Sequence, residues 1–194
     1  MCIITIVDEH VNALIILGIF YSEAGELFQI GDRIAHPMHG AGVISGVENR
    51  KINGVAREYY LLNLPVNGMQ VMIPVDSCEA IGVRNIVGEN DADRIIASIS
   101  SIEIVETQNW NKRYRENMLK IKSGDLLDVC GVIKSLMLRD RERGLSTGER
   151  KMLNVAKQIL ISELALSKNM EWEAINVIIE AAVYATDPEG CTVE

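Results

Sequence analysis

The hydrophobic pattern of the chain changes twice, near residue 27 and again near Gly88. Residues 3–21 are strongly apolar, residues 28–73 hold short β-like runs, and beyond Gly88 apolar positions recur every three or four residues. A period of two indicates strands and a period near 3.6 indicates amphipathic helices. The pattern therefore predicts an N-terminal extension, a small β domain and a helical domain.

The β section consists of short runs rich in Ile, Val, Tyr and Leu, at residues 28–35, 41–47, 58–64 and 69–73. Turn-forming residues separate them: Pro37 to Gly40, Asn53-Gly54 and Asn67-Gly68. Asn-Gly tolerates the positive φ angles of a tight hairpin turn. We expect a small, strongly bent sheet or SH3-like barrel over residues 28–88.

The helical section is predicted to contain five helices, at residues 91–100, 111–122, 125–143, 146 to about 167, and 170–185. Ser146 and Glu149 have the spacing of a capping box, in which each side chain binds the other residue's backbone N–H. Asn169 is placed to cap the last helix. The expected fold class is α+β: a β barrel at 28–88, a compact all-α domain at 89–185 and a tail at 186–194.

The apolar N-terminal stretch is interrupted by Asp8, Glu9, His10 and Asn12. A membrane span needs about 20 mostly uncharged residues, and a signal peptide needs a basic front end that is missing from this stretch. We interpret residues 1–27 either as a disordered extension or as translated sequence upstream of the true start. No membrane association is expected.

Composition and cysteine spacing indicate a folded cytoplasmic protein. Of the 194 residues, 48% are hydrophobic, and the four cysteines are far apart, without a Cys-x-x-Cys pair. We expect reduced thiols. His36 and His39 flank a proline turn without a third ligand, so no metal is expected, and no cofactor. With no Ser-His-Asp or Cys-His arrangement, we expect a protein that is not an enzyme.

Charge is distributed unevenly along the chain. Residues 107–160 carry twelve basic and six acidic side chains, a net charge of +6, whereas the whole chain has a net charge of −8. An acidic protein with one basic section is unlike a general polyanion binder. Any contact with nucleic acid is therefore expected to be local and delivered by a partner.

Trp110 is the most informative single residue, because it is one of only two tryptophans and stands beside Asn111, Lys112, Arg113 and Arg115. One interpretation is an apolar wedge next to phosphate-binding charges. The other is a core or interface tryptophan, since Trp is usually mostly buried. The residues alone do not favour either interpretation of Trp110. Tyr114, one helical turn later, is expected to pack against Trp110 and orient it.

Several separated motifs occur in the same order as in one known family. They are Phe28 to Gly42, Asn109 to Arg115 with Ser123 to Asp125, and Arg139 to Ser146 with Gly148 to Leu153. Together they resemble the bacterial CarD and CdnL transcription regulators over roughly residues 28–182. The resemblance implies an N-terminal Tudor-like RNA polymerase-interacting domain, shared with transcription-repair coupling factor, and a helical DNA-binding domain.

The resemblance also implies roles for particular residues. The β domain would bind the RNA polymerase β subunit, with Arg50 matching a polymerase-contacting Arg and Ile52 beside it, in the manner of strand addition. Met72 stands where relatives carry a basic residue, which puts a second charged contact in doubt. Trp110 would insert in the minor groove at the upstream edge of the promoter bubble. The residues expected to hold DNA phosphates are Lys112, Arg113 and Arg115 first, then Arg150 and Lys151.

The expected function is a transcription regulator that stabilises the promoter open complex, largely without reading DNA sequence. We expect a monomer, associated with the nucleoid through the polymerase. The alternative is an adaptor that keeps polymerase binding but whose helices bind another protein rather than DNA. A repair-linked module is disfavoured because no helicase motifs accompany the β domain.

Overall fold

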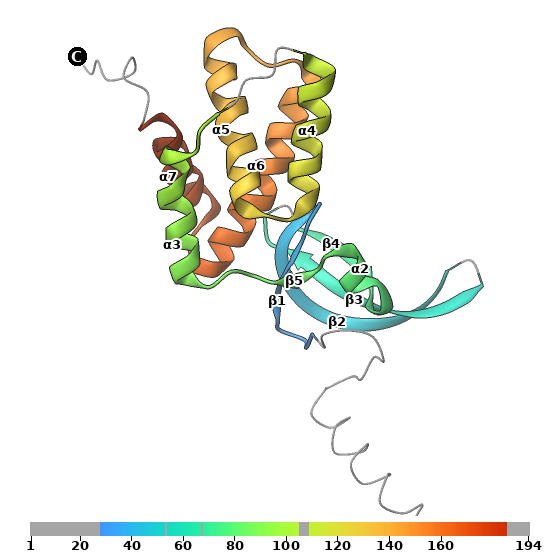
Figure 1. The fold of residues 1–194 in the computed structure, drawn as a ribbon. Coiled ribbons are helices and arrows are strands. Elements are labelled where there is room, and N and C mark those ends of the chain that lie inside the picture. Colours follow the sequence, from blue (N-terminus) through green and yellow to red (C-terminus); the bar gives the residue numbers. More distant parts are fainter. Residues whose placement is uncertain (1–27, 53, 67, 105–108, 186–194) are drawn as a thin grey trace, which may run out of the picture.

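The computed structural model describes residues 28–52, 54–66, 68–104 and 109–185. The expected extension at 1–27 and the tail at 186–194 lie outside these residues, as do Cys2 and Cys191. The described chain forms a sheet with a group of helices standing on it (Figure 1). In this part of the chain, no helix is long and apolar enough to cross a membrane.

The N-terminal part is an antiparallel five-stranded sheet with the strand order β4-β3-β2-β1-β5. Its strands are β1 (Arg33–His36), β2 (Gly40–Ile52), β3 (Val55–Leu64), β4 (Met69–Pro74) and β5 (Arg84–Asn85). The α+β class, with the β part before the helices, is confirmed. The first strand begins at Arg33 rather than Phe28, because Gly31 turns the chain with φ 98°. Phe28 instead packs edge-on against Tyr60.

Strands β2 and β3 are longer than expected and form a ribbon that projects beyond the sheet (Figure 1). Strand β1 pairs with β2 only over residues 40–43, and β4 pairs with β3 only over residues 59–64. The pairing of β2 with β3 nevertheless continues to Ile52 and Val55. Gly54, at the tip of the ribbon, has φ 84°, as the hairpin turn requires.

Five main helices follow, with bounds close to those expected: α3 (Glu89–Ser98), α4 (Trp110–Ser123), α5 (Leu126–Arg143), α6 (Thr147–Lys168) and α7 (Trp172–Tyr184). Shorter elements are η1 (Val75–Ser77), α2 (Cys78–Ile81) and η2 (Ile99–Ser101). The capping box of Ser146 and Glu149 is confirmed at the start of α6. The expected role of Asn169 was wrong: it ends α6 in a left-handed conformation, and Glu171 is the N-cap of α7.

Each part of the molecule has its own apolar core. The core of the sheet centres on Ile34, Ile44 and Leu62, and the core of the helices centres on α5 and α6. Cys78 lies in the core of the sheet and Cys130 in the core of the helices. Burial raises the pKa of Cys78 to about 11 and that of Cys130 to about 12, so both are protonated thiols at neutral pH.

Helix α6 joins the two parts, because its second half packs on the sheet. The Ala41 N–H donates to Ser162 Oγ at 2.8 Å, and Gln158 Nε2 donates to the His39 carbonyl at 3.1 Å. Glu163, only 1% exposed, accepts hydrogen bonds from the Arg84 guanidinium and, at 3.1 Å, from the Val87 N–H. Polar contacts that are buried or partly buried are costly to separate, so they hold the sheet and the helices together.

Candidate nucleic-acid interface

Trp110 is the first residue of α4, at the end of the helical part that lies away from the sheet. The side chain of Asn109 accepts a hydrogen bond from the Lys112 N–H at 3.1 Å, which starts the helix at this residue. Trp110 remains 44% exposed. Asparagine is a favoured N-cap residue, so the local sequence fixes where the indole emerges from the fold.

One face of the indole is covered by the protein. The rings of Trp110 and Tyr114 are stacked, with centroids 5.3 Å apart and an interplanar angle of 25°. Gly148, in the first turn of α6, lies beneath both: a Cβ atom there would be 3.6 Å from Trp110 Cζ2 and 3.7 Å from Tyr114 Cε2. The packing expected of Tyr114 is therefore present, and the rest of the indole is free to meet a partner.

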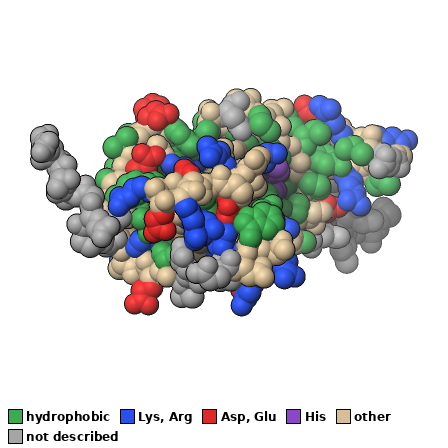
Figure 2. Space-filling model, turned by 90° about the horizontal axis from the view of Figure 1, so that it is seen from above, with side chains coloured by type: hydrophobic (Ala, Val, Ile, Leu, Met, Phe, Trp, Pro, Cys, Tyr) green, Lys and Arg blue, Asp and Glu red, His purple; other side chains and the backbone are tan. Residues whose placement is uncertain are grey.

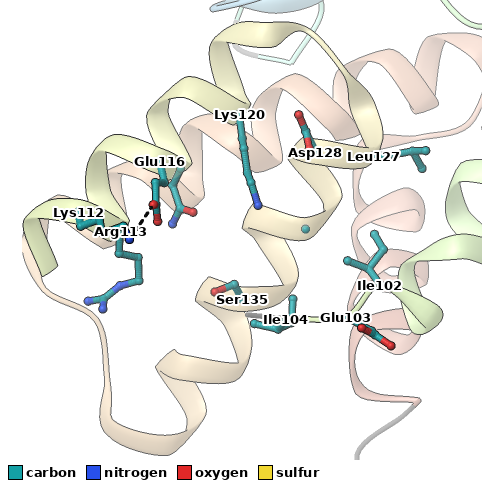
Figure 3. Close-up of a pocket in the computed structure, with 12 residues that line it drawn as sticks. Ile102, Glu103, Ile104, Lys112, Arg113, Glu116, Lys120, Leu127, Asp128 and Ser135 are labelled. Atoms are coloured by element: carbon teal, nitrogen blue, oxygen red, sulfur yellow. Dashed lines mark ion pairs between the residues drawn. The ribbon is translucent and has the colours of Figure 1, made fainter. Parts of the chain in front are cut away.

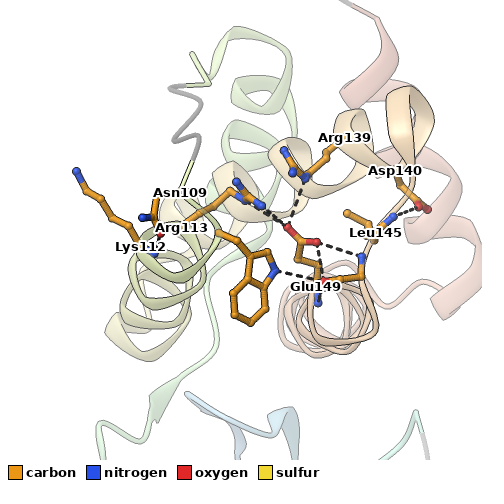
Figure 4. A network of polar contacts seen from close by, with 9 residues as sticks. Asn109, Lys112, Arg113, Arg139, Asp140, Leu145 and Glu149 are labelled. Carbon is orange, nitrogen blue, oxygen red and sulfur yellow. Dashed lines mark hydrogen bonds and ion pairs between the residues drawn. The ribbon is translucent and has the colours of Figure 1, made fainter.

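The indole N–H is held by the capping box of α6 (Figure 4). Trp110 Nε1 donates to Ser146 Oγ at 3.3 Å, and the same hydroxyl donates to Glu149 Oε2 at 2.7 Å. The Ser146 N–H also donates to Glu149 Oε2, at 3.1 Å. The cap that starts α6 thus also binds the first residue of α4.

The structure places Arg113 differently from the expectation that it contacts phosphate. Arg113 is 7% exposed, and its guanidinium forms a buried ion pair with Glu149, with Nη2 2.7 Å from Oε1. Arg139 Nε lies 3.4 Å from the same oxygen, without hydrogen-bond geometry. The sequence contained a signal for this burial, because Arg113 lies four and eight residues before Asn117 and Ile121, which share its buried face. Arg113 therefore stabilises the fold beneath the exposed surface through its ion pair with Glu149.

The Glu149 carboxyl is ionised. Burial would raise its pKa, but hydrogen bonds from Ser146 and Arg113 and the charge of Arg113 outweigh this and lower the pKa from 4.5 to about 2. Because the folded-state pKa is depressed, the stability that this group provides is present above about pH 4.5 and is lost as the pH falls toward 2.

We expect Glu149→Gln to lower the free energy of unfolding by about 2 kcal/mol at pH 7, because a charged acceptor is lost from buried donors. The difference from the wild type should shrink as the pH falls from 4.5 toward 2. Urea unfolding at pH 7, 4.5 and 3 measures it. A difference that stays constant over this range would contradict the ionised state of the carboxyl.

Four of the five expected phosphate contacts are exposed around this end: Lys112, Arg115, Arg150 and Lys151. Lys112 makes a loose ion pair with Glu116 at 3.7 Å, and Arg150 Nη2 lies 3.4 Å from the Leu145 carbonyl. Figure 2, which looks onto this end, shows Lys and Arg side chains beside hydrophobic ones near the middle of the face.

Not all the basic residues of this section face outward. Lys134 is 4% exposed, and its ammonium donates to the carbonyls of Ser100 and Ile102 at 2.6 and 2.8 Å. Lys157 is paired with Glu180 at 2.8 Å. The net charge of residues 107–160 therefore overstates the positive charge that a ligand would meet.

A groove of about 650 Å³ runs beside this surface, between α4, α5 and residues 102–104 (Figure 3). Lys112 and Lys120 contribute positive charge to its lining, and Glu116 and Asp128 contribute negative charge. Because these charges offset one another, the groove is not a cationic channel for a phosphate backbone.

The polymerase-contact residues expected from the sequence lie on the projecting ribbon. Arg50 is exposed and forms an ion pair with Glu48 at 2.8 Å, and Ile52 is 43% exposed. Arg50 is directly opposite Arg57, so both point to the same face, whereas Lys51 points to the other. Met72, 40% exposed, lies on the edge strand β4. Ribbon and indole are thus on separate parts of the molecule.

Within the described residues, no three His, Cys, Asp or Glu side chains gather closely enough to hold a metal ion. The rings of His36 and His39 are 4.5 Å apart. Burial, followed by the neighbouring His39, lowers the pKa of His36 to about 4. His36 Nδ1 accepts a hydrogen bond from the Met38 N–H at 3.1 Å. His36 is therefore neutral at physiological pH and supports the turn between β1 and β2.

Comparison with known proteins gives matches over both parts of the chain. Residues 28–87 match the CarD-like/TRCF RID domain, and residues 94–180 match the CarD C-terminal domain. The protein named "Putative transcription factor YdeB", from Bacillus subtilis (strain 168), is 33% identical over 144 residues. That alignment covers 74% of this chain and 94% of the relative.

Proposed function

Since the chain belongs to the CarD-like family of transcription factors, we propose that it binds the RNA polymerase β subunit and stabilises melted promoter DNA with Trp110. The RID-type domain at residues 28–87 supplies polymerase binding. The helical domain supplies the contact with DNA at the upstream edge of the bubble. The protein acts by binding alone, as a monomer and without a cofactor.

The observation that carries the proposal is the state of Trp110. It is 44% exposed, yet stacked on Tyr114 and hydrogen-bonded to Ser146. A large aromatic side chain that is both exposed and held in one orientation suits insertion between partly unstacked bases, which hinders re-annealing of the strands. Because stacking of this kind accepts any base, the wedge needs no specific sequence.

The surrounding charges support this function. Lys112, Arg115, Arg150 and Lys151 are exposed at the same end of the helical part. Contacts with phosphates position a protein on DNA without reading its sequence. Arg113 is not part of this set, because its guanidinium is buried against Glu149. With an overall net charge of −8, the protein depends on the polymerase for its delivery to the promoter.

Polymerase binding is proposed to involve the projecting ribbon. Beyond residue 44, the outer edge of β2 is not paired with β1, so its backbone N–H and C=O groups can accept an added strand. Arg50 and Ile52 lie along this edge and supply specificity through charge and apolar contact.

We expect Arg50→Glu to weaken binding to the polymerase by roughly tenfold or more, because the reversed charge faces the group that Arg50 would meet. Surface plasmon resonance with immobilised polymerase or its isolated β-subunit domain measures the change. Lys51→Glu is the matched control, since it makes the same charge change on the opposite face of the ribbon. Equal losses from the two variants would indicate long-range charge effects and would contradict a contact at Arg50.

The proposed function is tested by the lifetime of open complexes formed by the cognate polymerase on a ribosomal-type promoter, with and without the wild-type protein. A longer lifetime is expected. Stabilisation by about 1.4 kcal/mol changes the lifetime roughly tenfold, so a modest wedge is sufficient. An unchanged lifetime at saturating, directly measured polymerase binding would reject the wedge in favour of a protein-binding adaptor.

A further inference from the structure

We infer that Ser146 and Glu149 are positioning residues that fix the orientation of the Trp110 indole before DNA is bound. The inference rests on the proposed function of Trp110 as a wedge, and it assigns to the capping box of α6 a role beyond starting a helix. Neither side chain is expected to touch DNA.

The first argument comes from the hydrogen-bonding capacity of the Ser146 hydroxyl. A hydroxyl has one proton to donate and two lone pairs that accept. The ionised Glu149 carboxylate can only accept, so the proton must point to Oε2, 2.7 Å away. Both lone pairs are then available, one for the Glu149 N–H and one for Trp110 Nε1, each at 3.3 Å. The hydroxyl therefore makes all three of its hydrogen bonds, and the carboxylate sets the direction of its O–H bond.

The second argument is that Glu149 is connected to α4 twice, through different oxygen atoms. Oε2 reaches the indole through Ser146, and Oε1 binds the Arg113 guanidinium at 2.7 Å. Arg113 lies three residues after Trp110, on the same first turn of α4. One buried carboxylate therefore fixes both the position of the helix that carries the tryptophan and the rotation of its side chain.

The third argument concerns what the indole would do without these contacts. Trp110 is 44% exposed, so its indole N–H could donate to water. The N–H therefore does not need Ser146 as a hydrogen-bond acceptor. The effect of the contact with Ser146 is to select one rotamer, together with the stacking on Tyr114. A side chain that is already ordered loses less conformational entropy on binding. Preorganisation thus adds to the stability of the complex without a new contact.

The test uses the full-length protein in a Trp172→Phe background, so that Trp110 is its one tryptophan. Ser146→Ala removes the acceptor of the indole N–H, and Ser146→Thr keeps a hydroxyl and a helix cap. Asp125→Ala is the matched control: it removes the N-cap of α5, whose side chain accepts from the Leu127 and Asp128 N–H groups, far from the indole contacts. Time-resolved fluorescence anisotropy of the free protein, thermal unfolding and open-complex lifetime are measured for each.

Ser146→Ala is expected to increase the nanosecond motion of the indole and to reduce the extension of open-complex lifetime by roughly two- to tenfold, the equivalent of one hydrogen bond. Ser146→Thr should restore both properties. Asp125→Ala should lower the melting temperature about as much as Ser146→Ala, while indole motion and lifetime stay at the wild-type level.

The inference is overturned if Ser146→Ala leaves the anisotropy decay unchanged, or if Asp125→Ala lowers the lifetime as much as Ser146→Ala does. Its failure can be told apart from failure of the proposed function. The anisotropy is measured without DNA or polymerase, whereas the wedge itself is tested by the lifetime of the open complex and fails if Trp110→Ala has no effect on it.

Discussion

Trp110→Ala is expected to remove most of the effect of this protein on open-complex lifetime while leaving polymerase binding intact. Removing an aromatic that stacks on bases costs about 1–3 kcal/mol per base, which corresponds to a lifetime shorter by roughly five- to hundredfold. The proposed polymerase contact is on a separate part of the molecule, so the affinity for the polymerase should not change. Lifetimes are measured with a competitor such as heparin, and binding by surface plasmon resonance.

The matched control for this variant is Leu119→Ala. Leu119 is also on α4 and is 69% exposed, so the substitution removes an exposed apolar side chain from the same helix. Trp110→Phe should keep part of the effect, because it retains an aromatic wedge but loses the indole N–H. If Trp110→Ala and Leu119→Ala gave equal lifetimes, insertion of the indole would be excluded, and the adaptor function would be favoured.

Gly40→Ala is expected to lower the free energy of unfolding by about 3–5 kcal/mol, from a strained backbone and an overpacked contact. Gly40 has φ 85°, which L side chains rarely adopt, and it lies where the sheet meets α6. An added Cβ would come closer than 3.0 Å to Ser162 Oγ and to 3.0 Å from the Gln158 carbonyl oxygen. The hydrogen bond from the Ala41 N–H to Ser162 would be disrupted as well.

Gly54→Ala separates the two causes. Gly54 has nearly the same φ, 84°, but no atom lies within 4 Å of its added Cβ. Its cost should therefore be only the backbone strain, about 1–2 kcal/mol. Urea unfolding of both variants gives the comparison. Equal losses at the two positions would mean that the sheet and α6 do not pack as described.

Loosening this contact should also affect function. Helix α6 contacts Trp110 near its start, at Gly148, and the sheet near Ser162. At 1.5 Å per residue, these fourteen residues set a separation of about 21 Å between the two contacts. Gly40→Ala should therefore shorten the open-complex lifetime at temperatures where the protein is still folded. This is expected even though the proposed polymerase contact on the sheet and the proposed DNA contact on the helices are both unchanged.

Local features of the fold were predictable because they depend on neighbouring residues. The capping box at Ser146 and the start of α5 follow from side chains that bind backbone groups within three residues. The start of the first strand was misjudged because Gly31 turns the chain, and the cap of the last helix was misjudged because one residue can give either of two signals. Asn169 can begin a helix or end one, and its left-handed conformation at the end of α6 was the outcome.

The sequence by itself determined that a β part is followed by a helical part. It also singled out Trp110 as an aromatic side chain with positive charges near it. Only the tertiary structure decided which charges face outward. Arg113 is buried because Glu149, 36 residues away, is brought beneath it by the packing of α4 on α6. Helical periodicity identifies a buried face, but the partner that makes a buried charge tolerable comes from another element. For the same reason the sequence did not indicate the Arg84–Glu163 contact, which joins the sheet to the helices.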